Sequence, residues 1–79
     1  MNKTRRKALA RINERIEELR SELETLLEEE EECLDNIPEN LQGSEHYEIA
    51  EAALSNLSDA YETLDEVHGL LADIIDGEV

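Results

Sequence analysis

The sequence predicts an all-α fold, a two-helix antiparallel hairpin of the coiled-coil type that dimerises into a four-helix bundle. Apolar residues recur at alternating steps of three and four in both halves of the chain, and the single proline lies near the middle. A chain of 79 residues is long enough for one domain at most. We therefore expect one helical-hairpin domain over residues 1–79, with a helix at 4–35, a loop at 36–43 and a helix at 44–76.

The first helix is predicted by a heptad seam that no Gly or Pro interrupts. Good helix formers, mainly Glu and Arg, fill the positions between the seam residues. Asn2 or Thr4 can cap its start. The predicted seam consists of Leu9, Ile12, Ile16, Leu19, Leu23, Leu26, Glu30, Cys33 and Ile37.

The loop is predicted by Pro38, because the residue before a proline avoids the α conformation and the first helix must end there. Proline also suits the first position of a new helical turn, so we expect one short turn over residues 38–41. Ser44 is a favourable N-cap for the second helix.

The second helix carries a seam and a further apolar stripe beside it. Its seam consists of Tyr47, Ala50, Leu54, Leu57, Tyr61, Leu64, His68, Leu71 and Ile75. The stripe recurs every seven residues, so the apolar arc is wider than one partner helix can cover. In the first helix, Leu27 and Leu34 are apolar and lie outside the predicted seam. These surplus residues predict a homodimer interface, which consists of Leu27, Leu34, Ala53, Ala60, Val67 and Ile74.

The antiparallel register follows from the short connection between two long helices. Folding the chain near residue 40 brings apolar residues of the two helices level with each other. The expected pairs are Leu9 with Leu71, Ile16 with Leu64, Leu23 with Leu57, and Leu26 with Leu54.

Charge is divided by position along the chain, whose formal net charge is −15. All seven Lys and Arg lie within residues 3–20, and the residues after Arg20 carry 19 of the 22 acids. In a hairpin, the basic start lies beside the acidic end of the second helix, so we interpret it as stabilising the antiparallel pairing. A nucleic-acid-binding arm is the alternative, but no aromatic or DNA-reading pattern accompanies the basic residues.

The half of the hairpin nearest the loop carries acids without any base. There are 13 acids from Glu22 to Asp59, over roughly 28 Å of axis, which is about one charge per 2.2 Å. Duplex DNA carries about one charge per 1.7 Å, so this surface can imitate a phosphate backbone. A merely solvated acidic face is the alternative. The candidate partner-binding residues are Glu28, Glu29, Glu31, Glu32, Asp35, Glu39, Glu45, Glu48 and Glu51.

Candidate catalytic and metal-binding residues are few. Asp65 and His68 have the spacing of half a carboxylate-bridged di-metal motif, but no further carboxylates are expected at their level. Cys33 has no histidine predicted beside it, and Glu30 is a polar seam residue of the kind that sets register. The sequence contains no phosphate-binding loop, nucleophile elbow or calcium loop. We therefore expect no enzyme activity, no catalytic residue, no cofactor and no metal site.

The expected cellular setting is the cytoplasm. No apolar run approaches the roughly 20 residues of a membrane span, and no hydrophobic segment follows the basic start as in a secretory signal. Cys33 is the only cysteine, so no intrachain disulfide can form, which is usual in reducing compartments. We expect no binding to membranes.

The loop reads DNIPENLQGSE over residues 35–45 and is followed by Tyr47 and Glu48. It resembles the loop of small acidic helical-hairpin proteins encoded by Gram-positive gut bacteria, their phages and mobile elements. The likeness extends to the Glu-rich run before the loop and the Ala-, Leu- and Asp-rich helix after it. It brings no catalytic residue. It implies a phage or mobile-element context, in which an acidic miniprotein can inhibit a host nucleic-acid enzyme, as anti-CRISPR and anti-restriction factors do.

Two functions are open at the level of sequence. The first is a non-catalytic acidic interaction protein that mimics nucleic acid, binds the basic groove of a host defence or nucleic-acid enzyme, and does not itself bind nucleic acid. The second is a structural or scaffolding coiled coil whose acidity serves solubility. Both are expected to act as homodimers.

Overall fold

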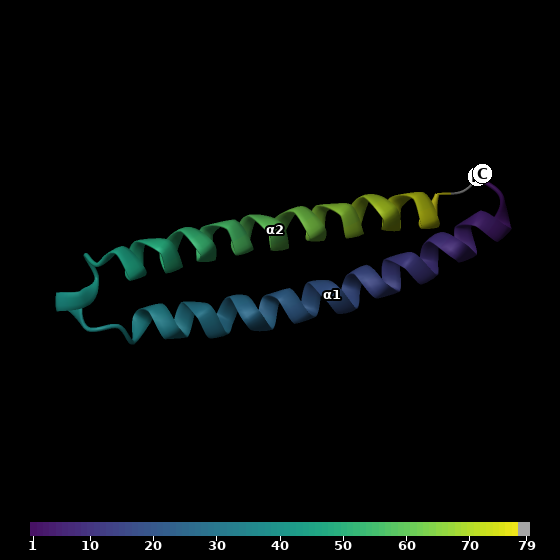
Figure 1. Ribbon diagram of the computed structural model, residues 1–79. Helices are drawn as coiled ribbons and strands as arrows, with labels where there is room; N and C mark the ends of the chain where they lie inside the picture. The colour runs from purple at the N-terminus through teal and green to yellow at the C-terminus, as the bar shows by residue number, and fades with distance from the viewer. Residues whose placement is uncertain (78–79) are drawn as a thin grey trace.

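The computed structural model describes residues 1–77, which form a hairpin of two long helices (Figure 1). Helix α1 spans Lys3–Asp35, a short 3-10 turn η1 spans Glu39–Leu41, and helix α2 spans Glu45–Asp76. The hairpin is 59 Å long and only 14 by 13 Å across. The loop lies at one end, and the start of α1 lies beside the end of α2 at the other. The prediction of an all-α helical hairpin is confirmed.

Side-chain caps begin both helices. The Oδ1 atom of Asn2 accepts a hydrogen bond from the backbone N–H of Arg5 at 2.8 Å, and the Oγ atom of Ser44 accepts one from the N–H of Tyr47 at 3.2 Å. Each cap satisfies a donor that has no partner within its helix. Between the helices, η1 follows Pro38 directly, as expected from the fixed backbone of proline.

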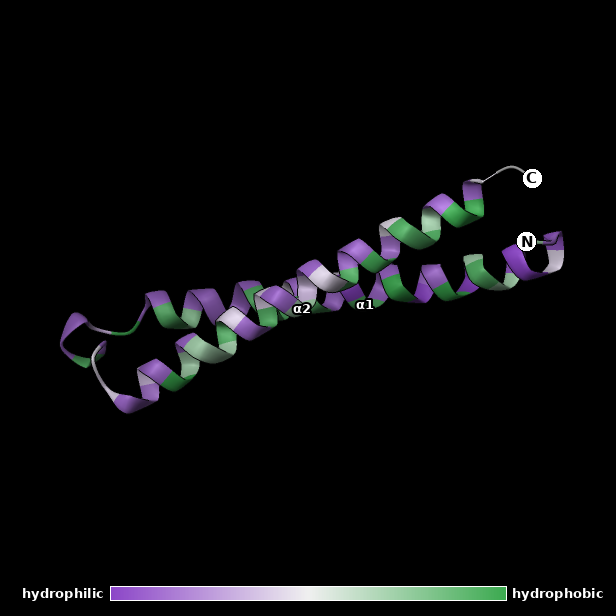
Figure 2. Cartoon of the chain, turned by 90° about the horizontal axis from the view of Figure 1, so that it is seen from above, coloured by the Kyte–Doolittle hydropathy of each residue, from purple (hydrophilic) through white to green (hydrophobic). Residues whose placement is uncertain are grey.

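The seam of α2 lies where the sequence predicts it. All nine of its predicted residues are partly buried, whereas the second stripe of Ala53, Ala60, Val67 and Ile74 is exposed. Seen from above, the two helices cross near their middle, with green apolar segments recurring along both (Figure 2). This shallow crossing is the geometry by which a seam of alternating steps stays on its partner helix.

The seam of α1 differs from the prediction. Leu9, Ile16, Leu23, Glu30 and Ile37 are partly buried as expected. The positions between them, however, are one residue later than predicted. Those that turn towards α2 are Asn13, Arg20, Leu27 and Leu34, and those left exposed are Ile12, Leu19, Leu26 and Cys33.

The prediction that Leu27 and Leu34 face away from α2 is therefore wrong. Leu34 is 5% exposed and is the most buried apolar side chain of residues 1–77, whereas Leu26 is 54% exposed. Adjacent residues lie about 100° apart around a helix, so either set keeps steps of three and four with the shared seam residues. Near the loop, the observed set buries two leucines where the other would bury one leucine and Cys33, and the larger apolar area is favoured.

The register also differs from a fold at residue 40. Arg20 contacts Asp65 and Glu24 contacts Tyr61, so α2 is shifted by about one turn from the predicted pairing. As a result, Leu54 shares a hollow with Leu34, while Leu26 shares one with Leu57 and Ala60. The shift accompanies the different seam of α1. When α1 is rotated about its own axis, other apolar residues face α2, and they lie at different heights along the helix.

Candidate interaction surfaces

One long side of the hairpin is apolar, and we call it the apolar face. Along each helix, the seam residues come in pairs that are three residues apart. In an antiparallel arrangement, the residue just before the first member of each such pair lies on the same side of both helices. A shallow groove on this side is lined by Leu26 of α1 together with Ala53 and Ala60 of α2. The apolar face consists of Ile12, Leu19, Leu26, Cys33, Ala53, Ala60, Val67 and Ile74, all of which are exposed.

The apolar face changes which residues form the candidate dimer interface. The predicted interface residues of α2 all lie on the apolar face. On α1, the predicted Leu27 and Leu34 do not lie on this face, which is formed there by Ile12, Leu19, Leu26 and Cys33. Sequence reasoning missed these four because it had placed them in the seam. The signal that could have found them is the same seven-residue spacing that revealed the stripe of α2.

The opposite long side is polar, and we call it the acidic face. It carries Glu17, Glu24, Glu31, Glu51 and Asp65, all exposed. A hydrogen bond joins the Arg20 guanidinium to an Asp65 carboxylate oxygen at 2.6 Å, and the Tyr61 hydroxyl donates to Glu24 at 2.7 Å. Because these bonds run between α1 and α2, they bridge the helices along this face and define their register.

The Tyr61 hydroxyl has its titration altered by contacts on this face. Its hydrogen bond to Glu24 raises the phenol pKa above the ordinary value of 10.0, because the ionised phenolate would lose that bond. Partial desolvation and the charge of the Glu24 carboxylate act in the same direction, while Arg20 opposes them. Tyr61 is therefore a neutral donor that connects the helices.

A polar cluster interrupts the seam between Asn13 and His68. Asn13 is 7% exposed, and its Nδ2 donates to the backbone carbonyl of His68 at 3.2 Å. The Oδ1 atom of Asn13 is buried without a hydrogen-bond partner. His68 Nδ1 lies 3.5 Å from the Arg20 guanidinium, and His68 Nε2 lies 3.9 Å from a Glu17 oxygen. One buried asparagine in a seam costs stability and fixes the register.

Asp65 and His68, which have the spacing of half a di-metal motif, lie at this cluster. In the structure, an Asp65 carboxylate oxygen accepts a hydrogen bond from the Arg20 guanidinium at 2.6 Å. Within residues 1–77, no three Asp, Glu, His or Cys side chains are gathered closely enough to hold a metal ion. The geometry here serves helix pairing.

The acidic residues around the loop form no ion pair with a base of residues 1–77. All nine candidate partner-binding acids, from Glu28 to Glu51, are exposed. The ion pairs found among the described residues are Arg20 with Asp65 and His68 with Glu17, and neither involves these acids. The structure thus brings the nine carboxylates together around one end of the hairpin, available to an external cation.

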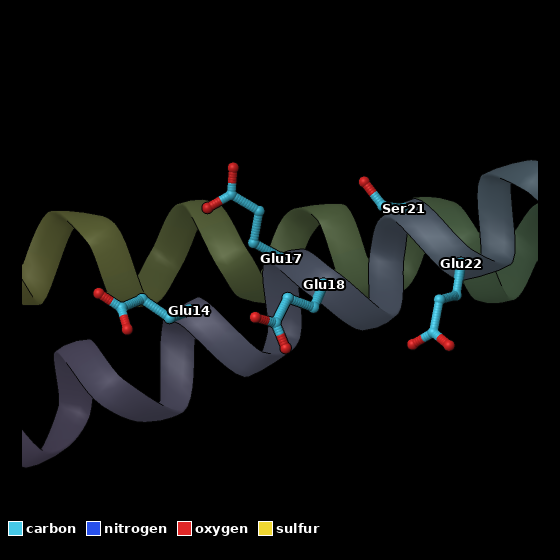
Figure 3. A pocket seen from close by; sticks show the side chains of 5 residues that line it. All are labelled: Glu14, Glu17, Glu18, Ser21 and Glu22. Carbon is cyan, nitrogen blue, oxygen red and sulfur yellow. The ribbon is translucent and has the colours of Figure 1, made fainter.

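A second acidic cluster lies on α1 further from the loop. Glu14, Glu17, Glu18, Ser21 and Glu22 line a shallow hollow along this helix (Figure 3). Figure 3 shows all five side chains projecting from α1, with α2 behind. Sequence reasoning missed this cluster because it weighed the density of acids near the loop. The signal was present in the spacing of three, four and eight residues, which places side chains on neighbouring turns.

The basic start of the chain is joined to α2 by one ion pair among the described residues. Of the six Lys and Arg before Arg20, none forms an ion pair within 4.0 Å with an acid of the described residues, whereas Arg20 pairs with Asp65 of α2. The basic start does lie beside the end of α2, as expected (Figure 1), and among the described residues the ion pair that joins it to α2 is Arg20 with Asp65. Long basic side chains at an exposed helix start gain little by pairing in water.

Comparison with known proteins gives no relative for this chain: no protein family, no curated protein and no solved structure matches it. Neither described helix has an apolar stretch of the length and low charge needed to cross a bilayer.

Proposed function

We propose that this protein is a non-catalytic acidic interaction protein whose loop half binds the basic groove of a nucleic-acid-handling enzyme as a mimic of nucleic acid. The observation that carries the proposal is the set of nine exposed carboxylates around the loop, none of them paired with a base of the described residues. Unpaired charges of one sign on a narrow rod attract a surface of the opposite sign and steer its approach.

The shape of the hairpin supports the same proposal. A rod 14 by 13 Å across is narrow enough to enter a groove, measured between Cα atoms. The near-DNA charge spacing gives it a comparable electrostatic profile. A defence enzyme of the host, inhibited by a phage or mobile-element protein of anti-CRISPR type, is the partner class that the resemblance of the loop favours.

The test uses duplex DNA immobilised on a resin and loaded with a bacterial extract. The purified chain should displace one or a few DNA-binding proteins at low salt, and high salt should weaken the effect. Changing Glu28, Glu29, Glu31 and Glu32 to Gln removes four charges with little change in helix propensity, and should abolish most of the displacement. Each single contact is expected to contribute about 1 kcal/mol or less, so the group must be changed together.

A matched control removes the same number of charges from the other end of the hairpin. Glu62, Glu66, Asp73 and Asp76 are exposed, and their amide variants leave the loop half intact. This control variant should displace the captured proteins from the DNA as effectively as the unaltered chain does. Equal losses in the two variants would show a response to net charge alone, and no displacement by the unaltered chain would overturn the mimic.

A scaffolding coiled coil is the second candidate, and the apolar face favours it. This face leaves Leu19 53% and Leu26 54% exposed, which suits an assembly better than an isolated chain. A scaffold would displace nothing from DNA, and its loss of assembly would follow substitutions on the apolar face.

Both candidates include self-association, and we propose that two hairpins form a four-helix bundle through the apolar face. The hairpin alone buries little: among residues 1–77 Leu34 is the one apolar residue that is almost fully buried. A second copy would cover the exposed leucines and isoleucines that water now contacts.

A further inference from the structure

The apolar face is built in four layers, each with one residue from α1 and one from α2. The Arg20–Asp65 and Glu24–Tyr61 hydrogen bonds fix which turns of the two helices are level. With that register, the layers follow one another every seven residues, or about 10 Å. From the chain ends to the loop they are Ile12 with Ile74, Leu19 with Val67, Leu26 with Ala60, and Cys33 with Ala53.

We propose that a second copy of the chain binds this face in the antiparallel orientation, with the loop of one hairpin beside the chain ends of the other. The proposal rests on the self-association proposed above, and adds to it the orientation and the residues that meet. Two independent features of the face, the size of its residues and the direction of its charge, select this arrangement over the parallel one.

The residues of the face become smaller towards the loop. The first layer holds two isoleucines, and the last holds Cys33 and Ala53. In the antiparallel arrangement the largest layer of one hairpin meets the smallest layer of the other, and the two middle layers meet each other. In the parallel arrangement large layers would meet large ones and small layers would meet small ones. Protein interiors are close-packed, so the first arrangement fills space evenly, while the second crowds one end and leaves gaps at the other.

The charge of the hairpin also changes along its length. All seven Lys and Arg lie within residues 3–20, at the end with the chain ends, and the 13 acids of residues 22–59 surround the loop. A parallel pair would place the two acidic halves side by side. An antiparallel pair sets the basic start of each chain beside the acidic loop half of the other. The basic side chains before Arg20 make no ion pair within the described hairpin, so they remain available.

One specific contact follows from the symmetry. A twofold axis between the Leu19 and Leu26 layers brings Arg15 of one copy level with Glu29 of the other, to within about 1.5 Å along the axis. Both residues are exposed and lie on the flank of α1 that borders the apolar face. In a parallel pair the same two residues would be about 21 Å apart along the axis. The acidic face lies on the other side of each hairpin and stays exposed in this dimer, whereas Glu29, one of the nine acids around the loop, pairs with Arg15 of the other copy.

The first measurement is the mass in solution, followed by the distance between the two loops. Cys33→Ala removes the native thiol and keeps its layer small, and Asn40→Cys adds a label site at the exposed loop. In the antiparallel dimer the spin labels should be about 40 Å or more apart, while a parallel dimer would bring them within about 20 Å. A monomer at all concentrations overturns both the self-association and its orientation. A dimer with adjacent loops overturns the orientation alone.

The second measurement is a charge exchange that needs no label. Arg15→Glu and Glu29→Arg should each weaken dimerisation about tenfold, because each creates two like-charge contacts per dimer. The double variant restores both attractions and should return to within about threefold of the unaltered chain. If the losses of dimer affinity in the two single variants simply add up in the double variant, Arg15 and Glu29 are not in contact. That result would overturn the contact and the proposed register. Circular dichroism confirms that each variant remains helical, and DNA displacement by the unaltered chain tests the acidic function separately.

Discussion

Replacing Leu34 by Ala tests which face of α1 packs against α2. Leu34 is 5% exposed in the hairpin. Large-to-small changes of buried leucines cost about 2–5 kcal/mol, and we expect about 2–3 kcal/mol here because the two-helix core is thin and collapses easily. With a urea dependence of about 1 kcal/mol per molar for so small a chain, the unfolding midpoint should fall by about 2–3 M.

Leu26→Ala is the matched control, because it makes the same chemical change on the neighbouring face. The Leu26 side chain is 54% exposed, so its loss should cost less than about 1 kcal/mol in the isolated hairpin. The assay is urea unfolding followed by circular dichroism at low and at high protein concentration. If two hairpins associate through the apolar face, the cost of Leu26→Ala should grow with concentration, while that of Leu34→Ala should not.

The heptad seam predicted from sequence gives the opposite order, with Leu26 inside and Leu34 outside. If Leu26→Ala lowers the free energy of unfolding as much as Leu34→Ala does at the lowest protein concentration, the observed orientation of α1 is refuted. That result would also remove the α1 half of the apolar face and thus the proposed dimer interface.

Three further changes test the seam, the helix and the bond between helices. Asn13→Leu should stabilise the hairpin by about 1 kcal/mol, raising the melting temperature by about 4–8 °C, because it removes a buried oxygen that has no partner. A lower melting temperature would show that the bond to His68 outweighs that cost. Gly69→Ala should add about 0.5–1 kcal/mol in urea unfolding, because Gly69 is inside α2 with open space where a Cβ would stand; no gain would contradict this. Tyr61 should ionise above pH 10.0 in an absorbance titration with the other tyrosine changed to Phe, and Glu24→Gln should lower its pKa. The folded chain holds the Tyr61 phenol proton more tightly than the unfolded chain does. The stability that the hydrogen bond to Glu24 contributes is therefore complete below pH 10.0 and is lost as the pH rises through the folded pKa. A titration midpoint of Tyr61 at or below pH 10.0 would contradict the bond.

The sequence by itself determined the local features of this protein. The caps at Asn2 and Ser44 and the turn after Pro38 depend on neighbouring residues, so they could be predicted from chain neighbours alone. The seam of α2 could be predicted because its apolar arc has one clear centre. The exposure of the nine acids around the loop could be predicted too, because ionised carboxylates without partners stay in water.

Only the tertiary structure decided which side of α1 faces its partner. Two sets of residues, one led by Ile12 and the other by Asn13, complete the same heptad pattern with Leu9 and Ile16. The sequence pattern favours the more apolar set, because the pattern consists only of the hydrophobic residues along one helix. In the folded hairpin, Leu27 and Leu34 bury more apolar area near the loop, and the polar residues of their set find partners on α2. Those partners lie 45 or more residues away along the chain, so the choice depends on contacts that no local pattern contains.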